Sequence, residues 1–518
     1  MKRISSLKGK IDWTTTLVPF AIVLALMIVF MLLPEHSKGF VDTVRSFLGD
    51  TLGLYYAVFG IGVLITTIYI ACSKYGNIRL GDSDKPLYGN FKWGTMIFTS
   101  TMAADILFYS LCEWALYGGE TRVQQLGSMQ EWAPALTLFH WGPIAWCFYV
   151  ILAIAFGFMI HVRKRDRQRF SEACRPLFGN RIDGPMGRVI DIIAIFSIVC
   201  ATATTFSLAT PLLSKAFSSL TGIPDGITVT IMLLLLICTV YTVAVWFGVE
   251  GISRLATFCS YLFFALLFYF LFLGGETRYI LETGFQSIGT LVQNFVSLST
   301  YLDPLRENHF PQNWTIYYWA YWIAWCCATP FFIALISKGR TIRNVVFGTY
   351  GWGLAGTFMS FIILGNYGLA QQLKHGMDIS GFIEKGGSMY DAILRIFGTL
   401  PLPVLALGIL VITMIAFYST TFDGITYVTS SYSYKHLSAD KEPGRKIRSF
   451  WSIMLILFPI GLLFARNSLY SIQSVTIIAA FPIVILSILI TISFFKDVNK
   501  YLSEKPTRAD THETRTEK

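Results

Sequence analysis

The sequence contains few charged residues. Only 14% of its 518 residues are Asp, Glu, Lys or Arg, whereas soluble domains carry about 25%. Hydrophobic residues make up 54%, and the mean hydropathy is +0.56. Because a charge at the centre of a bilayer costs several kcal/mol, such a low charge content is typical of chains with a large lipid-facing surface. The composition therefore excludes an ordinary soluble protein and predicts a membrane protein.

The sequence also lacks the patterns of a disulfide framework, a metal centre or a catalytic centre. Its nine cysteines have no paired spacing in loops, and five of them lie within apolar runs. No nucleophile–base pair, cluster of metal ligands or phosphate-binding loop stands out, so we expect neither a cofactor nor enzymatic activity. The basic N-terminal stretch has no small-residue cleavage site, and the first apolar run is therefore expected to remain in the membrane.

Apolar runs long enough to cross a bilayer recur along the chain. A span needs roughly 20 apolar residues to cross about 30 Å of hydrocarbon, and about twelve segments meet this criterion. In lipid, such runs satisfy their backbone hydrogen bonds only as helices. They lie near residues 14–34, 53–73, 92–117, 132–160, 188–213, 226–247, 253–274, 314–336, 343–367, 398–431, 449–466 and 472–495. The sequence therefore predicts an all-α polytopic membrane protein.

Basic residues fall on nearly every second connection between these runs. The fourth run is followed by the densest cluster, in residues 163–175, and the second, eighth and tenth runs are followed by others. The connections between them are poorer, with Arg122 alone after the third run and Arg466 alone after the eleventh. The positive-inside rule places the basic side, together with both termini, in the cytoplasm. We therefore assign the net charge of +10 to topology and lipid rather than to nucleic-acid binding.

Two long connections lie on the outer side in this topology. The first, residues 275–313, contains an apolar-patterned stretch at 280–298 that is too polar to span, and we expect a helix lying along the surface. The second is residues 367–397. The polar tail at 496–518 is expected to be disordered.

The segment 314–325, WTIYYWAYWIAW, is unusually aromatic, since seven of its twelve residues are Trp or Tyr. On a helix, Trp314, Tyr318, Tyr321 and Trp325 share one face, with Trp322 at its edge. Interfacial anchoring explains Trp314 well, but Trp322 and Trp325 lie two to three turns deeper. Aromatic faces in a dry pocket attract trimethylammonium groups through cation–π contact. From spacing alone, anchoring and cation binding both stay open.

A second aromatic set occurs in the fourth run, FHWGPIAWCFY at 139–149. Gly142 and Pro143 should interrupt or bend this helix. Irregular backbone in a membrane occurs only where protein or a water-filled cavity covers it, so Trp141 and Trp146 are expected to flank a cavity. His140 has no partner ligand nearby in sequence, and we interpret it as structural.

These segments, together with 336–343 (ISKGRTIR), resemble the signature segments of the betaine/carnitine/choline transporter family from about residue 93 to residue 495. The resemblance implies two N-terminal helices followed by two inverted five-helix repeats, with a midplane site on broken helices. It also implies alternating access and a homotrimer. The corresponding divisions are the N-terminus 1–13, two helices in 14–90, the first repeat 91–275, the outer helix and loop 276–313, the second repeat 314–495 and the tail 496–518.

By this resemblance, the aromatic box of the family falls on Trp141, Trp146, Tyr149 and Trp322. Trp325 would lie one turn further along the substrate path. The family usually has a Trp pair where this chain has Tyr321 followed by Trp322. Tyrosine keeps a π face but adds a hydroxyl, which changes how a substrate would be oriented.

The third run contains the segment 99–105, TSTMAAD, in which we take Met102 as a candidate for the coupling or ion site. Sodium-coupled betaine carriers of the family have a glycine-rich segment here, whereas proton-coupled choline carriers similarly place Asp at the position of Asp105. An acid within a span is a functional candidate by default. Asp105 could pair with a substrate cation or accept a proton, and the structural alternative is an ion pair with Arg254. Glu113, two turns further on, fits a gating or a structural role equally.

Other residues bear on the coupling ion. Arg254 resembles the arginine that occupies a sodium position in the sodium-independent carnitine/γ-butyrobetaine exchanger, although topology alone would also explain it. Thr420 and Thr421 lie where sodium-coupled relatives supply two hydroxyl ligands, but such hydroxyls commonly bond to their own helix backbone. The balance favours sodium independence.

The sequence thus predicts a secondary transporter of a quaternary-ammonium compound such as choline, glycine betaine or carnitine, located in the cytoplasmic membrane and driven by proton coupling or exchange. A sodium-coupled betaine symporter is the nearest alternative. A membrane-bound sensor with the same pocket, or an ion channel, are the alternatives of another class.

Overall fold

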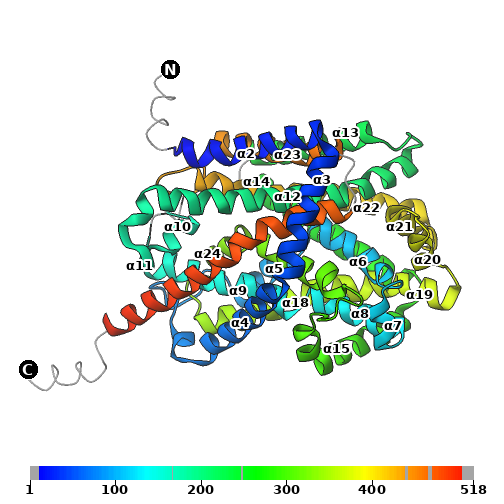
Figure 1. Ribbon diagram of the computed structural model, residues 1–518, viewed down its shortest axis with the longest axis horizontal. Helices are drawn as coiled ribbons and strands as arrows, with labels where there is room; N and C mark the ends of the chain where they lie inside the picture. The colour runs from blue at the N-terminus through cyan, green and yellow to red at the C-terminus, as the bar shows by residue number, and fades with distance from the viewer. Residues whose placement is uncertain (1–10, 166, 247–248, 438–440, 465–468, 505–518) are drawn as a thin grey trace, which may run out of the picture.

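The computed structural model describes residues 11–165, 167–246, 249–437, 441–464 and 469–504. These residues fold almost entirely into helices, and the described ranges contain no β-strand beyond two isolated bridges. The expectation of an all-α polytopic membrane protein is confirmed (Figure 1). Apolar runs form helices here because lipid offers no alternative partner for the backbone N–H and C=O groups.

Three helices precede the first predicted repeat. They are α2 (Trp13–Leu32), α3 (Pro34–Arg45) and α4 (Gly53–Cys72), and a π-helical turn at Ser46–Thr51 links α3 to α4. The side chain of Asp12 caps α2 by accepting a hydrogen bond from the backbone N–H of Thr15 at 3.3 Å. The predicted spans 14–34 and 53–73 correspond to α2 and α4, and α3 is an additional helix between them.

The first predicted repeat contains five span-length units joined by short helices. Its helices are α5 (Asn90–Thr99), α6 (Ala104–Leu116), α7 (Thr121–Leu126), α8 (Met129–His140), α9 (Pro143–Gly157), α10 (Phe170–Ala173), α11 (Arg175–Phe178), α12 (Pro185–Thr221), α13 (Ile227–Trp246) and α14 (Val249–Phe268). π-Helical turns extend α9 to Val162 and α14 to Leu273.

The second predicted repeat follows the outer helix α15 (Thr277–Thr300). It begins with a π turn at Pro311–Thr315 and comprises α16 (Ile316–Trp325), α17 (Thr329–Ile336), α18 (Ile342–Ser360), α19 (Asn366–His375), α20 (Ile379–Glu384), α21 (Met389–Gly398), α22 (Pro403–Tyr432), α23 (Arg445–Phe464) and α24 (Leu469–Glu504). A π turn at Phe361–Gly365 joins α18 to α19.

Two of the spans are sharply bent. The pair α5 and α6 bends by 65°, and the pair made by Pro311–Trp325 and α17 bends by 55°. Within the described ranges, eight other helices are long and apolar enough to cross a membrane, so the total is up to ten if each bent pair is one span. The count of twelve stays a prediction, as does the inverted relation of the repeats, although a bent pair opens each one.

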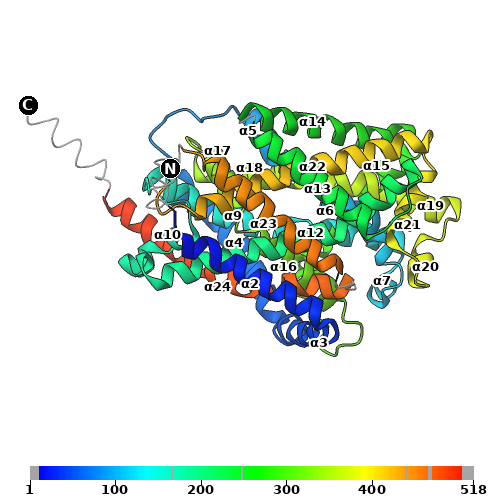
Figure 2. The same cartoon turned by 90° about the horizontal axis from the view of Figure 1, so that it is seen from above.

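The two ends of the helix bundle differ. The short helix α10 and the end of α24 lie at the left in Figures 1 and 2, whereas α7, α19, α20 and α21 lie at the right. At the α10 end, Arg169 contacts Asp12 at 3.2 Å, and Arg165 contacts Asp497 at 2.5 Å. The start of α2 and the end of α24 therefore meet the same basic connection, which is the one predicted to be cytoplasmic.

The outer connections are more helical than the sequence suggested. The stretch predicted as a surface helix is helical, as α15, and it exposes a stripe of apolar side chains at Leu281, Phe285, Val292 and Val296. Its place along the outer surface stays a prediction. The carboxylate of Glu276 joins the start of α15 to the end of α19 through two basic side chains, Lys374 and His375. At the other end, α24 continues to Glu504, so disorder is wrong for residues 496–504. The rest of the tail lies outside the described residues.

Candidate substrate site

The four predicted box residues come from α8, α9 and α16 and lie together in the core. Trp141 and Trp146 lie on either side of the break between α8 and α9, Tyr149 follows one turn later on α9, and Trp322 lies on α16. Their exposed fractions are 1%, 1%, 7% and 4%. None of the four therefore faces lipid, and anchoring at the membrane surface does not explain them.

The rings of these four residues pack directly against one another. Trp322 is central, because its ring centroid lies 5.8 Å from that of Trp141, 5.3 Å from that of Trp146 and 4.8 Å from that of Tyr149. The Trp146 and Tyr149 centroids are 5.7 Å apart. These separations are those of rings in contact. We call this group the aromatic cluster.

The break between α8 and α9 is the one expected from Gly142 and Pro143. The α8 helix ends at His140, Gly142 is extended with φ −99° and ψ −151°, and Pro143 begins α9. The backbone oxygen of Trp141, freed at this break, accepts a hydrogen bond from Thr357 of α18 at 3.1 Å. The irregular backbone is thus covered by protein, as a dry surrounding requires.

A glycine of α18 allows the cluster to form. A Cβ atom at Gly353 would lie 2.6 Å from the indole ring of Trp146, closer than such contacts are ever found. Only a glycine therefore lets α18 approach this ring. Gly351, two residues earlier, faces open space, since a Cβ atom there would have no neighbouring heavy atom within 4 Å.

Asp105 lies beside the cluster at the start of α6, directly after the bend from α5. It is 5% exposed, and its Oδ2 accepts a hydrogen bond from the hydroxyl of Tyr321 at 2.5 Å. The same hydroxyl contacts Thr205 of α12. Oδ1 of Asp105 has no hydrogen-bond partner among the described residues. The partner of Asp105 is therefore a tyrosine of α16, in place of the ion pair with Arg254 that the structural alternative required.

Trp325 and Trp314 mark the two ends of α16. Trp325 is 9% exposed and lies at the bend before α17, and its indole N–H has no partner among the described residues. Trp314 donates to Oε1 of Glu120 at 2.7 Å. Burial raises the pKa of the Glu120 carboxyl, although this hydrogen bond partly opposes the rise. Trp314 therefore has a specific polar partner at the end of the bundle predicted to be outer.

A buried polar network adjoins the cluster, and sequence reasoning did not anticipate it. Glu113 accepts hydrogen bonds from the indole N–H of Trp141 at 2.7 Å and from the Tyr117 hydroxyl at 2.5 Å. His140 contacts the Tyr117 hydroxyl at 2.7 Å and Thr315 at 3.0 Å. The interpretation of His140 as structural thus omitted its link to Glu113, which lies 27 residues earlier.

The residues predicted to bear on ion coupling do not share one contact. Met102 is buried within the bend between α5 and α6, and Arg254 is exposed near the start of α14. The Thr420 hydroxyl donates to the backbone oxygens of Ala416 and Phe417, at 3.3 and 3.0 Å, and Thr421 is half-buried one residue later. The proposed roles of these residues stay predictions.

A comparison of the sequence with known protein families agrees with this geometry. The sequence profile of the betaine/carnitine/choline family transporters matches residues 14–503. This chain belongs to that family. It is therefore a multi-pass membrane transporter and not an enzyme.

Individual members of the betaine/carnitine/choline transporter family match over most of their length. The chain is 30% identical to a probable glycine betaine transporter of Desulfitobacterium hafniense over 93% of this chain and 97% of that one. It is 28% identical to the glycine betaine transporter OpuD of Bacillus subtilis, over 90% of each. It is 27% identical to a carnitine transporter of Acinetobacter baumannii, over 85% of this chain and 80% of that one.

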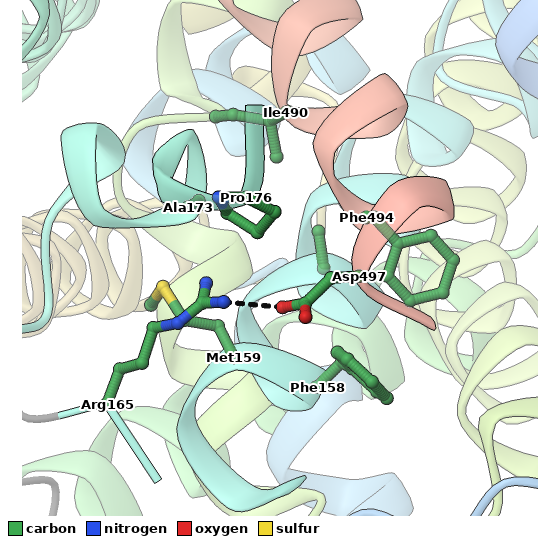
Figure 3. Close-up of a pocket in the computed structure, with 9 residues that line it drawn as sticks. Phe158, Met159, Arg165, Ala173, Pro176, Ile490, Phe494 and Asp497 are labelled. Atoms are coloured by element: carbon green, nitrogen blue, oxygen red, sulfur yellow. Dashed lines mark hydrogen bonds and ion pairs between the residues drawn. The ribbon is translucent and has the colours of Figure 1, made fainter. Parts of the chain in front are cut away.

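A small cavity lies away from the aromatic cluster, at the end of the helix bundle where α10 and the basic connection 163–175 lie. Its volume is about 10 Å³, roughly that needed for one water molecule. Figure 3 shows that the ion pair of Arg165 with Asp497 lines this cavity, together with apolar side chains that include Phe158, Met159 and Phe494. It is too small for an organic substrate and plays no part in the candidate site.

Proposed function

We propose that this transporter carries a small quaternary-ammonium compound by alternating access and without sodium. The observation that carries the proposal is the aromatic cluster, in which Trp322 meets three rings of α8 and α9 away from lipid. The negative face of such rings attracts a methylated ammonium without any formal charge on the protein. The relatives named above are glycine betaine and carnitine transporters, which agrees with this class of substrate.

Motion is needed for the cluster to take up a cation. A cation–π contact places the ammonium within about 6 Å of a ring centroid, on the ring's face. The Trp322 ring is already in contact with three others, so a cation between any two of them requires these rings to move apart. The bends after α5 and after α16 lie next to Asp105 and Trp325. They supply the natural hinges for a transporter that exposes the site to one side at a time.

Two sets of unpaired polar groups beside the cluster bear on which substrate it takes. The indole N–H groups of Trp146, Trp322 and Trp325 are buried donors without partners among the described residues. A carboxylate or hydroxyl oxygen of a substrate would satisfy them. Oδ1 of Asp105 is instead an unpaired acceptor within the described part of the chain, which favours a substrate that donates a hydrogen bond and carries a net positive charge, such as choline.

The absence of a sodium requirement rests on different groups. The Thr420 hydroxyl is already bonded to the backbone of its own helix, as hydroxyls within helices commonly are. Asp105, a buried acid held by a tyrosine hydroxyl, can accept a proton in place of a coupling cation. We therefore propose proton coupling or exchange.

Uptake into sealed proteoliposomes tests the proposal. Radiolabelled choline, glycine betaine and carnitine are offered with and without sodium and pH gradients, to the wild type and to Asp105→Asn. We expect saturable, sodium-independent uptake of at least one compound, and a shift of preference toward the zwitterions in the variant, since the repulsion of their carboxylate is removed. Binding without flux would identify a sensor instead, and no binding of any of the three would refute the substrate class.

A further inference from the structure

Glu113 of α6 is completely buried next to the aromatic cluster, yet it does not touch the faces of the rings. Its exposed fraction is 0%, and both of its carboxylate oxygens accept hydrogen bonds. One of these comes from the indole N–H of Trp141, whose ring packs against that of Trp322. The carboxylate therefore fixes the position of the Trp141 ring through a hydrogen bond at the edge of that ring.

With Glu113 ionised, the hydrogen-bond partners allow one arrangement of the protons in this network. Tyr117 has a single hydroxyl proton, which points to Glu113 across 2.5 Å. The Tyr117 oxygen must then accept from Nδ1 of His140, 2.7 Å away, so Nδ1 carries a proton. The other ring nitrogen, Nε2, lies 3.0 Å from the Thr315 hydroxyl. A hydroxyl either donates or accepts, so this contact suits both neutral and protonated His140 without movement of the heavy atoms.

No arginine or lysine of the described residues lies within ion-pair distance of Glu113, although the buried Arg45 of α3 acts electrostatically on the neighbouring Tyr317. His140, with Nδ1 3.4 Å from Oε1, is the basic side chain within ion-pair distance of Glu113 among the described residues. An isolated carboxylate in a dry interior is strongly unfavourable, so the network needs one further positive charge. Either a proton bound by the Glu113–His140 pair or a cation on the neighbouring ring of Trp141 can supply it.

We propose that Glu113 positions Trp141, and that the Glu113–His140 pair carries a proton when the site is empty and releases it when a quaternary-ammonium head occupies the aromatic cluster. The N–H bond at Nε2 of His140 breaks, the proton leaves to solvent past Thr315, and His140 remains neutral with Thr315 donating to it. This inference rests on the proposed function, because it takes the cluster as the binding site.

Other titratable groups surround the pair and have to be distinguished from it. Those facing Glu113 or its direct partners are Cys112 of α6, Tyr117 directly after α6, His140 of α8, Tyr317 and Tyr318 of α16, Glu120 before α7, and Arg45 of α3, which faces Tyr317. The remaining acid near the cluster is Asp105, which bonds to Tyr321. Asp105 is thus the group whose titration could be mistaken for that of Glu113.

Calorimetric titration of the full-length protein with choline, in buffers of different ionisation enthalpy, counts the protons released on binding. Choline has no titrating group, so every proton comes from the protein. We expect Glu113→Gln to release about one proton fewer than the wild type when choline binds. The choline affinity of the wild type should then change by up to about tenfold more per pH unit than that of the variant. Glutamine keeps an oxygen for Trp141 and an N–H for the Tyr117 oxygen, so the change separates charge from position. Asp105→Asn is expected to weaken choline binding, but at saturating choline it should still release the proton that Glu113→Gln does not release.

Each result decides the inference. Equal proton release in the wild type and Glu113→Gln, or loss of the proton in Asp105→Asn alone, overturns it and leaves the proposed function standing. Failure of the wild type to bind choline, glycine betaine and carnitine refutes the proposed function itself. If Glu113→Gln does not fold, the double variant Glu113→Gln, His140→Gln carries the same test, because neither amide can take the proton while both can hydrogen bond to Tyr117.

Discussion

Replacement of the Trp322 ring should separate cation binding from simple packing. Trp322→Leu keeps an apolar side chain but removes the π face that meets three other rings at 4.8–5.8 Å. In a desolvated site such a face contributes about 2 kcal/mol, so we expect the dissociation constant of the substrate to rise roughly 30-fold. Trp322→Phe retains a weaker π face and should cost less than about 1 kcal/mol.

Trp319 provides the control on the same helix. It is equally buried, and its ring meets Phe139 at 5.9 Å rather than the aromatic cluster. Trp319→Leu should therefore lower the melting temperature as Trp322→Leu does, because both leave a cavity, but it should not change substrate affinity. Binding is measured by calorimetry on purified protein, and folding by thermal melting. Equal losses of affinity in Trp322→Leu and Trp319→Leu, or in Trp322→Leu and Trp322→Phe, would refute the cation–π reasoning.

Uptake should continue when potassium replaces sodium on both sides of the vesicle, and its loss there would show that the chain needs a sodium ion. Gly353→Ala places a Cβ 2.6 Å from the Trp146 ring and should lower affinity and melting temperature together, whereas Gly351→Ala, with open space, should resemble the wild type. Burial alone would raise the pKa of Glu276, but hydrogen bonds from its two basic partners on α19 lower it. The stabilisation is therefore present above the usual titration range of a glutamate and is lost as the pH falls through the lowered pKa. Glu276→Gln should cost about 1 kcal/mol at neutral pH, and thermal melting should show wild type and variant converging at acidic pH, below the lowered pKa of Glu276; a constant difference would contradict this.

Local sequence signals were sufficient to predict a helix break where the residue types themselves determine the backbone conformation. Pro143 lacks an N–H and Gly142 tolerates the extended conformation, so the break between α8 and α9 could be predicted. Pro330 near the start of α17 gave the same signal for the bend after Trp325, but the surrounding aromatic run was interpreted as a continuous helix. The bend at 100–103 has no proline, and its small residues alone did not indicate it.

Interactions between distant segments could not be predicted from one sequence. The aromatic faces of 141–149 and 314–325 were visible as patterns, but their meeting at Trp322 depends on how α9 and α16 pack. Glu113 looked ambiguous because its partners, Trp141 and His140, lie 28 and 27 residues away along the chain. Likewise, an arginine was the one partner for Asp105 that the sequence suggested, and only the packing of α6 near α16 brings Asp105 to Tyr321.

A cryo-electron microscopy map of the protein with bound substrate tests the central claim most directly. We predict that the methylammonium head lies within about 6 Å of the ring centroids of Trp141, Trp146, Tyr149 and Trp322, and that the Trp322 ring is separated from at least one of the three rings it now contacts. A map in which these rings keep their present contacts, 4.8–5.8 Å between centroids, while the substrate is bound elsewhere would contradict the account.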